Sequence, residues 1–258
     1  MIPYIELTHL SLGPLTIQVW GLLVALGFLA GAWASARFAK EKGLDGKIVW
    51  DMLAWIILGS MLLGRLFHVF FYEPLYYLQN PIKIFALWEG GASIIGGFVG
   101  AIVFGVWYLY HRRVDVWKYA QVSVFGLPLG LFIGRIGCFL IHDHPGTLTD
   151  FVLGVKYPDG LVRHDHGLYL SLNGLFLFLF FLWMRHKKVN IEAYPIVFLL
   201  WYGTVRFFLD FLRAKEGVVV DERYLALTPA QYASILMVFM GLWLWRKYAS
   251  QLSSLSAK

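Results

Sequence analysis

The sequence contains few charged residues, and this scarcity limits the kind of protein it can encode. Charged side chains occupy 15% of its 258 positions, whereas soluble globular proteins carry roughly 25%. Hydrophobic residues make up 59% of the chain, and its mean hydropathy is +0.64. These values exclude a soluble enzyme built around one large core.

Cysteine is almost absent, and so is any sign of a cleaved leader. Cys138 is the only cysteine, so no disulfide can form within the chain. Because free cysteines are mostly buried apolar residues, we interpret Cys138 as packing rather than as a nucleophile. The N-terminus lacks the basic region and small-residue cleavage site of a signal peptide, and we expect the first hydrophobic segment to remain in the mature protein.

The hydrophobic residues instead gather in continuous runs of about 18 to 24 residues, the length that spans a bilayer. A β-barrel strand would show about ten residues of alternating polarity. The sequence therefore predicts an all-α polytopic membrane protein, a single membrane domain over residues 1–258. Seven spans are expected, at about 17–39, 49–72, 92–111, 117–141, 167–185, 193–212 and 229–247.

Basic residues predict how these spans are oriented. They cluster in the first, third and fifth connections and after the last span, which seven spans place on one side of the membrane. Cytoplasmic loops carry an excess of Lys and Arg, so we predict an N-terminus outside and a C-terminus in the cytoplasm. The net charge of +6 is then a signal of topology, and we predict no nucleic-acid partner. The four clusters are Arg37, Lys40, Lys42 and Lys47; Arg112, Arg113 and Lys118; Arg185, Lys187 and Lys188; and Arg246 and Lys247.

Four arginines fall within or near the predicted spans, where a charge costs about 2.5–3.5 kcal/mol. They are Arg65, Arg135, Arg206 and Arg213, and Asp210 is spaced to pair with either of the last two on a helix. For Arg213 the alternative is an interfacial arginine that reaches the headgroups. Glycines precede Arg65 and Arg135, and small residues let helices approach closely. Since guanidinium matches phosphate in bidentate fashion, we predict an intramembrane site for an anionic lipid; transport of a small anion is the alternative.

Two histidine-rich units bracket a long polar loop, 142–166, which is predicted to lie on the outer face. They are His142-Asp143-His144 and His164-Asp165-His166. Three interpretations stay open: a metal site, acid–base catalysis near neutral pH, or helix capping and loop hydrogen bonds. We predict neither a metal nor any other cofactor.

Several of these segments resemble the prolipoprotein diacylglyceryl transferase family. The resemblance covers VWGLLVALGF (19–28), LGRLFHVFFY (63–72), WEGGASIIGGFVG (88–100), GLFIGRIGCFL (130–140), RHDHGLY (163–169) and WYGTVRFFLDFLR (201–213). It implies an enzyme of the bacterial inner membrane that transfers the diacylglyceryl group of phosphatidylglycerol to the lipobox cysteine of a preprolipoprotein, releasing glycerol phosphate.

The resemblance also implies roles for individual residues. Arg135 matches an arginine that holds the phosphatidylglycerol headgroup, and Arg206 matches a second functional arginine. The remaining substrate-binding candidates are Arg65, Asp143, Asp210, Gly96 and Gly97.

The chain also departs from the family pattern. Ile95 stands where the family has a histidine often proposed as catalytic, and Cys138 stands where its signature has asparagine. A replacement base is therefore needed for the lipobox thiol, and His142, His144, His164 or His166 is predicted to supply it; a field of arginines that lowers the thiol pKa is the alternative. Two other functions remain: transfer of a lipid unit to another acceptor, or phospholipid binding or transport without catalysis.

Overall fold

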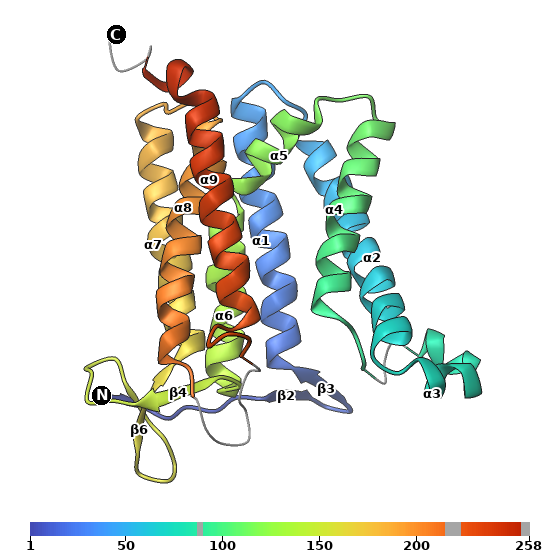
Figure 1. Cartoon of the computed structure of the whole chain (residues 1–258), viewed down its shortest axis with the longest axis vertical. Helices are drawn as coiled ribbons and strands as arrows, with labels where there is room; N and C mark the ends of the chain where they lie inside the picture. Colours follow the sequence, from blue (N-terminus) through green and yellow to red (C-terminus); the bar gives the residue numbers. More distant parts are fainter. Residues whose placement is uncertain (87–89, 215–222, 254–258) are drawn as a thin grey trace. The chain divides into compact units, whose positions relative to one another are not determined.

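The computed structural model describes residues 1–86, 90–214 and 223–253, and most of them are helical (Figure 1). Each of the seven predicted ranges contains helix. The elements are α1 (Val19–Glu41), α2 (Gly46–Phe71), α3 (Pro74–Gln79), η1 (Pro81–Phe85), α4 (Ile94–His111), α5 (Val116–Val124), α6 (Leu127–Ile141), α7 (His166–His186), α8 (Ala193–Leu209), η3 (Asp210–Leu212) and α9 (Pro229–Ser253).

The helices are those of a polytopic membrane protein. In the described part of the chain, α1, α2, α7 and the stretch Ala193–Leu212 are each long and apolar enough to cross a bilayer. The pair α5 and α6, bent by 48°, adds a fifth candidate as one broken span. α4 is apolar but shorter. The predicted span 117–141 is thus divided in two by a break at residues 125–126, next to Pro128, which is within the first turn of α6.

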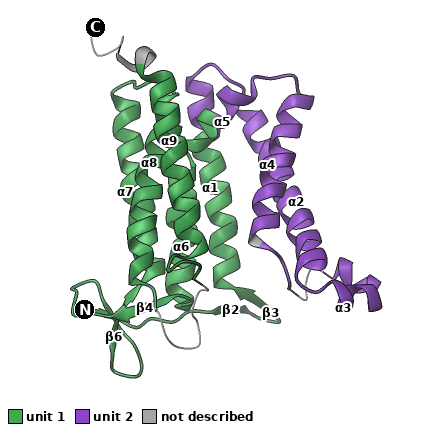
Figure 2. Ribbon diagram, viewed as in Figure 1, with its two compact units in different colours: residues 1–35, 121–258 green, residues 36–120 purple. Residues whose placement is uncertain are grey.

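The chain divides into two compact units, residues 36–120 and residues 1–35 with 121–258 (Figure 2). The unit of residues 36–120 is built on α2 packed against α4. A Cβ on Gly100 would collide with the carbonyl oxygen of Gly59, and Ser60 Oγ donates to the Gly97 carbonyl at 3.0 Å. Small residues at such a crossing let two helix backbones touch, as is common in membrane proteins.

The other unit is built on two helix pairs, α6 with α7 and α8 with α9. Gly167, in the first turn of α7, lies directly against the backbone of Cys138 and Phe139 in α6. The core of this unit includes the rings of Phe125, Phe181 and Tyr194, whose centroids are 5.1–6.2 Å apart.

Short strands cover one end of this second unit (Figure 1). A four-stranded sheet has the order β1 (Ile2–Pro3), β5 (Val155–Lys156), β6 (Val162–Asp165), β4 (Pro145–Leu148), and β2 (His9–Leu12) forms a hairpin with β3 (Leu15–Gln18). β1 runs parallel to β5, so the N-terminus is joined to the loop 142–166. The all-α prediction missed this sheet, because strands of two to four residues are too short to show a periodic pattern.

Candidate functional site

Arg135 lies on α6, nearly two turns before its C-terminal end, and is half-buried. Its Nη1 lies 3.7 Å from the Sγ atom of Cys138, which is the one hydrogen bond described for this guanidinium. α1 packs closely here, since a Cβ on Gly137 would meet the backbone of Trp20 at 3.3 Å. The expectation that glycines beside Arg135 mark a close helix contact is confirmed.

Arg206 lies in the last turn of α8 and pairs with a buried carboxylate. Its Nη1 is 2.9 Å from Oδ1 of Asp210, and Nη1 of Arg213 is 3.9 Å from the same oxygen. Asp210 is fully buried, and the Thr228 hydroxyl donates to its other oxygen, Oδ2. The prediction that Asp210 pairs with either arginine is confirmed. A carboxylate enclosed in this way cannot touch a ligand, so any effect of Asp210 on substrate must act through the arginines.

Arg135, Arg206, Asp210 and Arg213 form what we call the arginine cluster. The charges of Arg135 and Arg213 both act on Arg206, so the three cations lie within electrostatic reach of one another. Three guanidinium groups against one carboxylate leave an excess of positive charge. In an apolar surrounding such an excess attracts an anion strongly, and guanidinium is well suited to phosphate.

His142 is part of a buried structural network. It ends α6 in the left-handed conformation, with φ 47°, and its Nδ1 lies 2.7 Å from Oδ2 of Asp165. Its Nε2 lies 3.2 Å from the Ile5 carbonyl, and the ring of Tyr4 stacks on it at 4.2 Å. Asp165 also caps α7 by accepting from the Leu168 N–H. With both nitrogens occupied and its side chain 1% exposed, His142 ties the N-terminus to two helix ends and has no nitrogen open to a substrate.

Asp143 and His144 lie closer to solvent. Their side chains are 28% and 33% exposed, and Asp143 Oδ1 approaches His144 Nδ1 to 2.6 Å without an aligned hydrogen bond. The charge of Asp143 acts on Cys138, the neighbour of Arg135. The pair thus lies near the arginine cluster and leaves His144 Nε2 without a partner among the residues that the structure describes.

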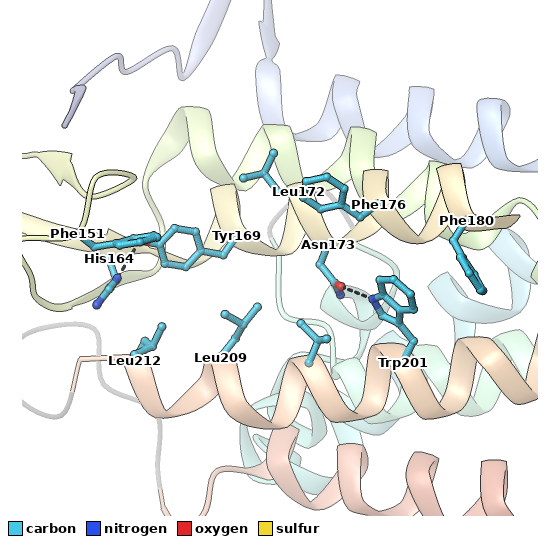
Figure 3. A pocket seen from close by; sticks show the side chains of 11 residues that line it. Phe151, His164, Tyr169, Leu172, Asn173, Phe176, Phe180, Trp201, Leu209 and Leu212 are labelled. Atoms are coloured by element: carbon cyan, nitrogen blue, oxygen red, sulfur yellow. Dashed lines mark hydrogen bonds between the residues drawn. The ribbon is translucent and has the colours of Figure 1, made fainter. Parts of the chain in front are cut away.

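His164 lies on β6 and points into a groove between α7 and α8 (Figure 3). Its Nδ1 is 2.8 Å from the Tyr169 hydroxyl, and burial lowers the pKa of His164 below its ordinary value of 6.5. The groove has a volume of about 620 Å³ and an almost entirely apolar lining. Among its described lining side chains, Trp201 Nε1 also donates to Asn173 Oδ1 at 2.9 Å (Figure 3).

His166, the first residue of α7, lies beside the arginine cluster. The sequence did not distinguish it from the other histidines. It is 2% exposed. Its Nδ1 lies 3.3 Å from Nη1 of Arg206, and its Nε2 lies 2.7 Å from the Leu209 carbonyl. These partners lie about 40 positions along the chain, at residues 206 and 209, so no local pattern could have revealed the contact.

Arg65, in the unit of residues 36–120, uses every donor of its guanidinium within the chain. Nε donates to the Ile84 carbonyl at 3.0 Å, Nη1 to those of Gly90 and Gly91, and Nη2 to those of Lys83 and Ala86. The ring of Tyr77 lies 5.1 Å from the guanidinium carbon. Arg65 was predicted to bind substrate, but a guanidinium with five carbonyl partners has no N–H left for a phosphate. Its contacts are instead those of a residue that shapes the loop after α2.

Gly96 and Gly97 lie in the first turn of α4, where they serve the contact with α2. A Cβ on Gly96 would collide with the Leu63 carbonyl. Ile95, at the position of the missing histidine, is 64% exposed. The preceding motif residues Trp88 and Glu89 lie outside the described residues. The geometry thus assigns these glycines to helix packing, and their predicted role in substrate binding stays a prediction.

Comparison with known proteins adds independent evidence. Residues 8–247 match the family model described as "Prolipoprotein diacylglyceryl transferase". The chain is 38% identical over 255 residues to the phosphatidylglycerol–prolipoprotein diacylglyceryl transferase of Nitratidesulfovibrio vulgaris strain DP4, covering 95% of each chain. It is 35% identical over 247 residues to the enzyme of the same name from Bordetella parapertussis, covering 93% of this chain and 94% of the relative.

The chain belongs to the prolipoprotein diacylglyceryl transferase family. In this family member the arginine cluster lies beside a thiol, Cys138, rather than the asparagine of the resembled signature. A thiol is a weak hydrogen-bond acceptor, so Arg135 is held less firmly than an amide oxygen would hold it. Among the described residues, no group of three or more His, Cys, Asp or Glu side chains is arranged to hold a metal ion.

Proposed function

We propose that this chain transfers the diacylglyceryl group of phosphatidylglycerol to the lipobox cysteine of a preprolipoprotein and releases glycerol phosphate. The observation that carries the proposal is the arginine cluster, found in a chain that matches this family over residues 8–247. Relatives that bear the name of this activity align with nearly the whole chain. No cofactor enters the proposed reaction.

Arg135 and Arg206 bind the phosphate of the lipid. The described contacts of Arg206 all involve Nη1, which leaves its Nε–Nη2 edge for two parallel hydrogen bonds to phosphate oxygens. Arg135 adds a second cation whose described partner is only a thiol. As the reaction proceeds, charge grows on the leaving phosphate, and fixed cations stabilise it most at that stage.

His144 is the base we propose for the lipobox thiol. The two ring nitrogens of His142 and of His166 are both occupied. His164 is held in a site whose burial lowers its pKa, which makes it a weaker base. His144 alone among the four combines a carboxylate beside Nδ1 with an open Nε2 in the described structure, and the carboxylate would stabilise the charge of the ring once Nε2 has accepted a proton.

The reaction balances as a single displacement. The thiol proton moves to His144 Nε2, and the thiolate attacks the carbon of the diacylglyceryl group that carries the phosphate. A carbon–sulfur bond forms, the carbon–oxygen bond to phosphate breaks, and glycerol phosphate departs with the bonding electrons. His144 then returns its proton to solvent or to the departing phosphate.

We further propose that the chain has seven spans in the bacterial inner membrane, with its N-terminus outside and its C-terminus in the cytoplasm. Within the unit of residues 1–35 and 121–258, the α7–α8 connection and the C-terminal end of α9 lie at the end opposite the sheets (Figure 1). Both carry basic clusters, as cytoplasmic segments do. Labelling of Asp159→Cys and Lys187→Cys, each in a Cys138→Ser background, with an impermeant maleimide on intact cells tests this: the first should react and the second should not.

Activity is tested with purified protein, phosphatidylglycerol and a synthetic lipobox peptide, measuring glycerol phosphate release and peptide lipidation. Arg135→Ala should lower kcat/KM by about a hundredfold or more, the usual effect of removing a group that stabilises developing charge. Arg163→Ala is the matched control, because Arg163 pairs with the half-exposed Asp159 on the surface and such pairs contribute little.

Two other outcomes would replace the proposal. Release of glycerol phosphate only when a different acceptor is supplied would favour a relative that lipidates another molecule. Tight phosphatidylglycerol binding with no release from any acceptor would favour a lipid-binding or transport protein.

A further inference from the structure

His166 has a fixed hydrogen-bonding pattern that its two partners determine. The Leu209 carbonyl can only accept, so the nitrogen 2.7 Å from it, Nε2, carries the hydrogen. The guanidinium of Arg206 can only donate, so the nitrogen 3.3 Å from it, Nδ1, presents its lone pair. Both contacts require the same neutral tautomer. A doubly protonated ring would direct an N–H at the cation of Arg206, in a side chain that is 2% exposed.

The same contact restricts how Arg206 can turn. Nη1 contacts His166 Nδ1 at 3.3 Å through a hydrogen bond and Asp210 Oδ1 at 2.9 Å through an ion pair without an aligned hydrogen bond. Asp210 begins η3, which directly continues the helix of Arg206, whereas His166 begins a separate helix, α7. The ion pair draws Nη1 toward Asp210, and the hydrogen bond with His166 restricts the direction of its N–H and so the orientation of the Nε–Nη2 edge.

We propose that His166 is a positioning residue that holds Arg206 so that its Nε–Nη2 edge faces the lipid phosphate. The inference rests on the proposed phosphate-binding role of Arg206. His166 does not touch the lipid and does not transfer a proton, since both of its nitrogens are occupied. Its contribution is to keep a long, flexible cation in the one orientation that allows two parallel hydrogen bonds to phosphate.

Two substitutions test separately the hydrogen bond of Nδ1 with Arg206 and that of Nε2 with Leu209. In His166→Asn the side-chain oxygen occupies nearly the position of Nδ1 and can still accept from Arg206. In His166→Gln the terminal amide lies near the position of Nε2 and can still donate to Leu209, but the acceptor for Arg206 is lost. His166→Ala removes both and serves as a second acceptor-free variant should the glutamine variant fail to fold.

Steady-state kinetics on the purified enzyme, with lipid and lipobox peptide varied in turn, provide the test. His166→Gln should raise the KM for phosphatidylglycerol about tenfold, the usual effect of losing a hydrogen bond to a charged group. The KM for the peptide should stay unchanged, and His166→Asn should stay within about twofold of the parent in both. A general loss of structure would change the KM for both substrates, and it would not produce a difference between His166→Asn and His166→Gln.

A double-mutant cycle shows whether His166 acts through Arg206. In an Arg206→Ala background, His166→Gln should have no further effect on the KM for phosphatidylglycerol. An undiminished effect in that background, or equal losses in His166→Asn and His166→Gln, would overturn the inference. If Arg206→Ala impairs lipid use while His166→Gln and His166→Ala do not, only the positioning role is refuted. If Arg206→Ala itself changes neither KM nor release, the phosphate-binding role of Arg206 is refuted as well.

Discussion

Replacing Arg65 with alanine should destabilise the protein rather than weaken lipid binding. The side chain is 4% exposed, and it donates to five backbone carbonyls of residues 83–91. A hydrogen bond contributes about 0.5–1.5 kcal/mol net, and each buried acceptor left without a partner costs more. Five such bonds give about 2.5 to 7.5 kcal/mol, and water entering the emptied site recovers part of it. We expect a loss of about 3 kcal/mol.

The assay compares thermal unfolding and limited proteolysis of the parent protein, Arg65→Ala and Arg65→Lys in detergent. Arg65→Ala should unfold several degrees lower and be cut faster between α2 and α4. Arg65→Lys, which retains a cation with three donors on a single nitrogen, should fall between the two because it cannot reach all five carbonyls. Unchanged unfolding and cleavage, together with a raised KM for phosphatidylglycerol, would refute this reasoning and return Arg65 to the substrate site.

Three further predictions concern other parts of the chain. His144→Gln should lower kcat strongly, with the KM for phosphatidylglycerol nearly unchanged, because a base acts on the thiol and not on the lipid phosphate; equal activity in the variant would exclude His144. Because burial lowers the pKa of folded His164, the unfolded chain takes up its proton first as the pH falls below about 6.5, and stability is lost there. The unfolding temperature of the parent should therefore fall more steeply than that of His164→Gln between about pH 7 and 5, and parallel curves would contradict the assignment. Gly100→Ala should destabilise the α2–α4 pair, since its Cβ would collide with the Gly59 backbone; an unfolding temperature equal to that of the parent would show that the helices separate at no cost.

The sequence by itself revealed the membrane character and the positions of the helical segments. Runs of apolar residues are a local property, because a helix in lipid satisfies its backbone hydrogen bonds within its own segment. For the same reason the pairing of Asp210 with Arg206 and Arg213, on one helical face, could be read from spacing alone. The resemblance over several motifs led to the family, which the comparisons confirm.

The tertiary structure decided which of the predicted site residues can reach a ligand. Arg65 and Arg135 look alike in sequence, each following a glycine, but five carbonyls surround the first and a thiol is the described partner of the second. His142 and His166 both have two occupied nitrogens, and their partners come from distant segments. Hydropathy and helical period describe a residue's own element, whereas the free lone pairs and N–H groups of a side chain depend on what other elements bring to it.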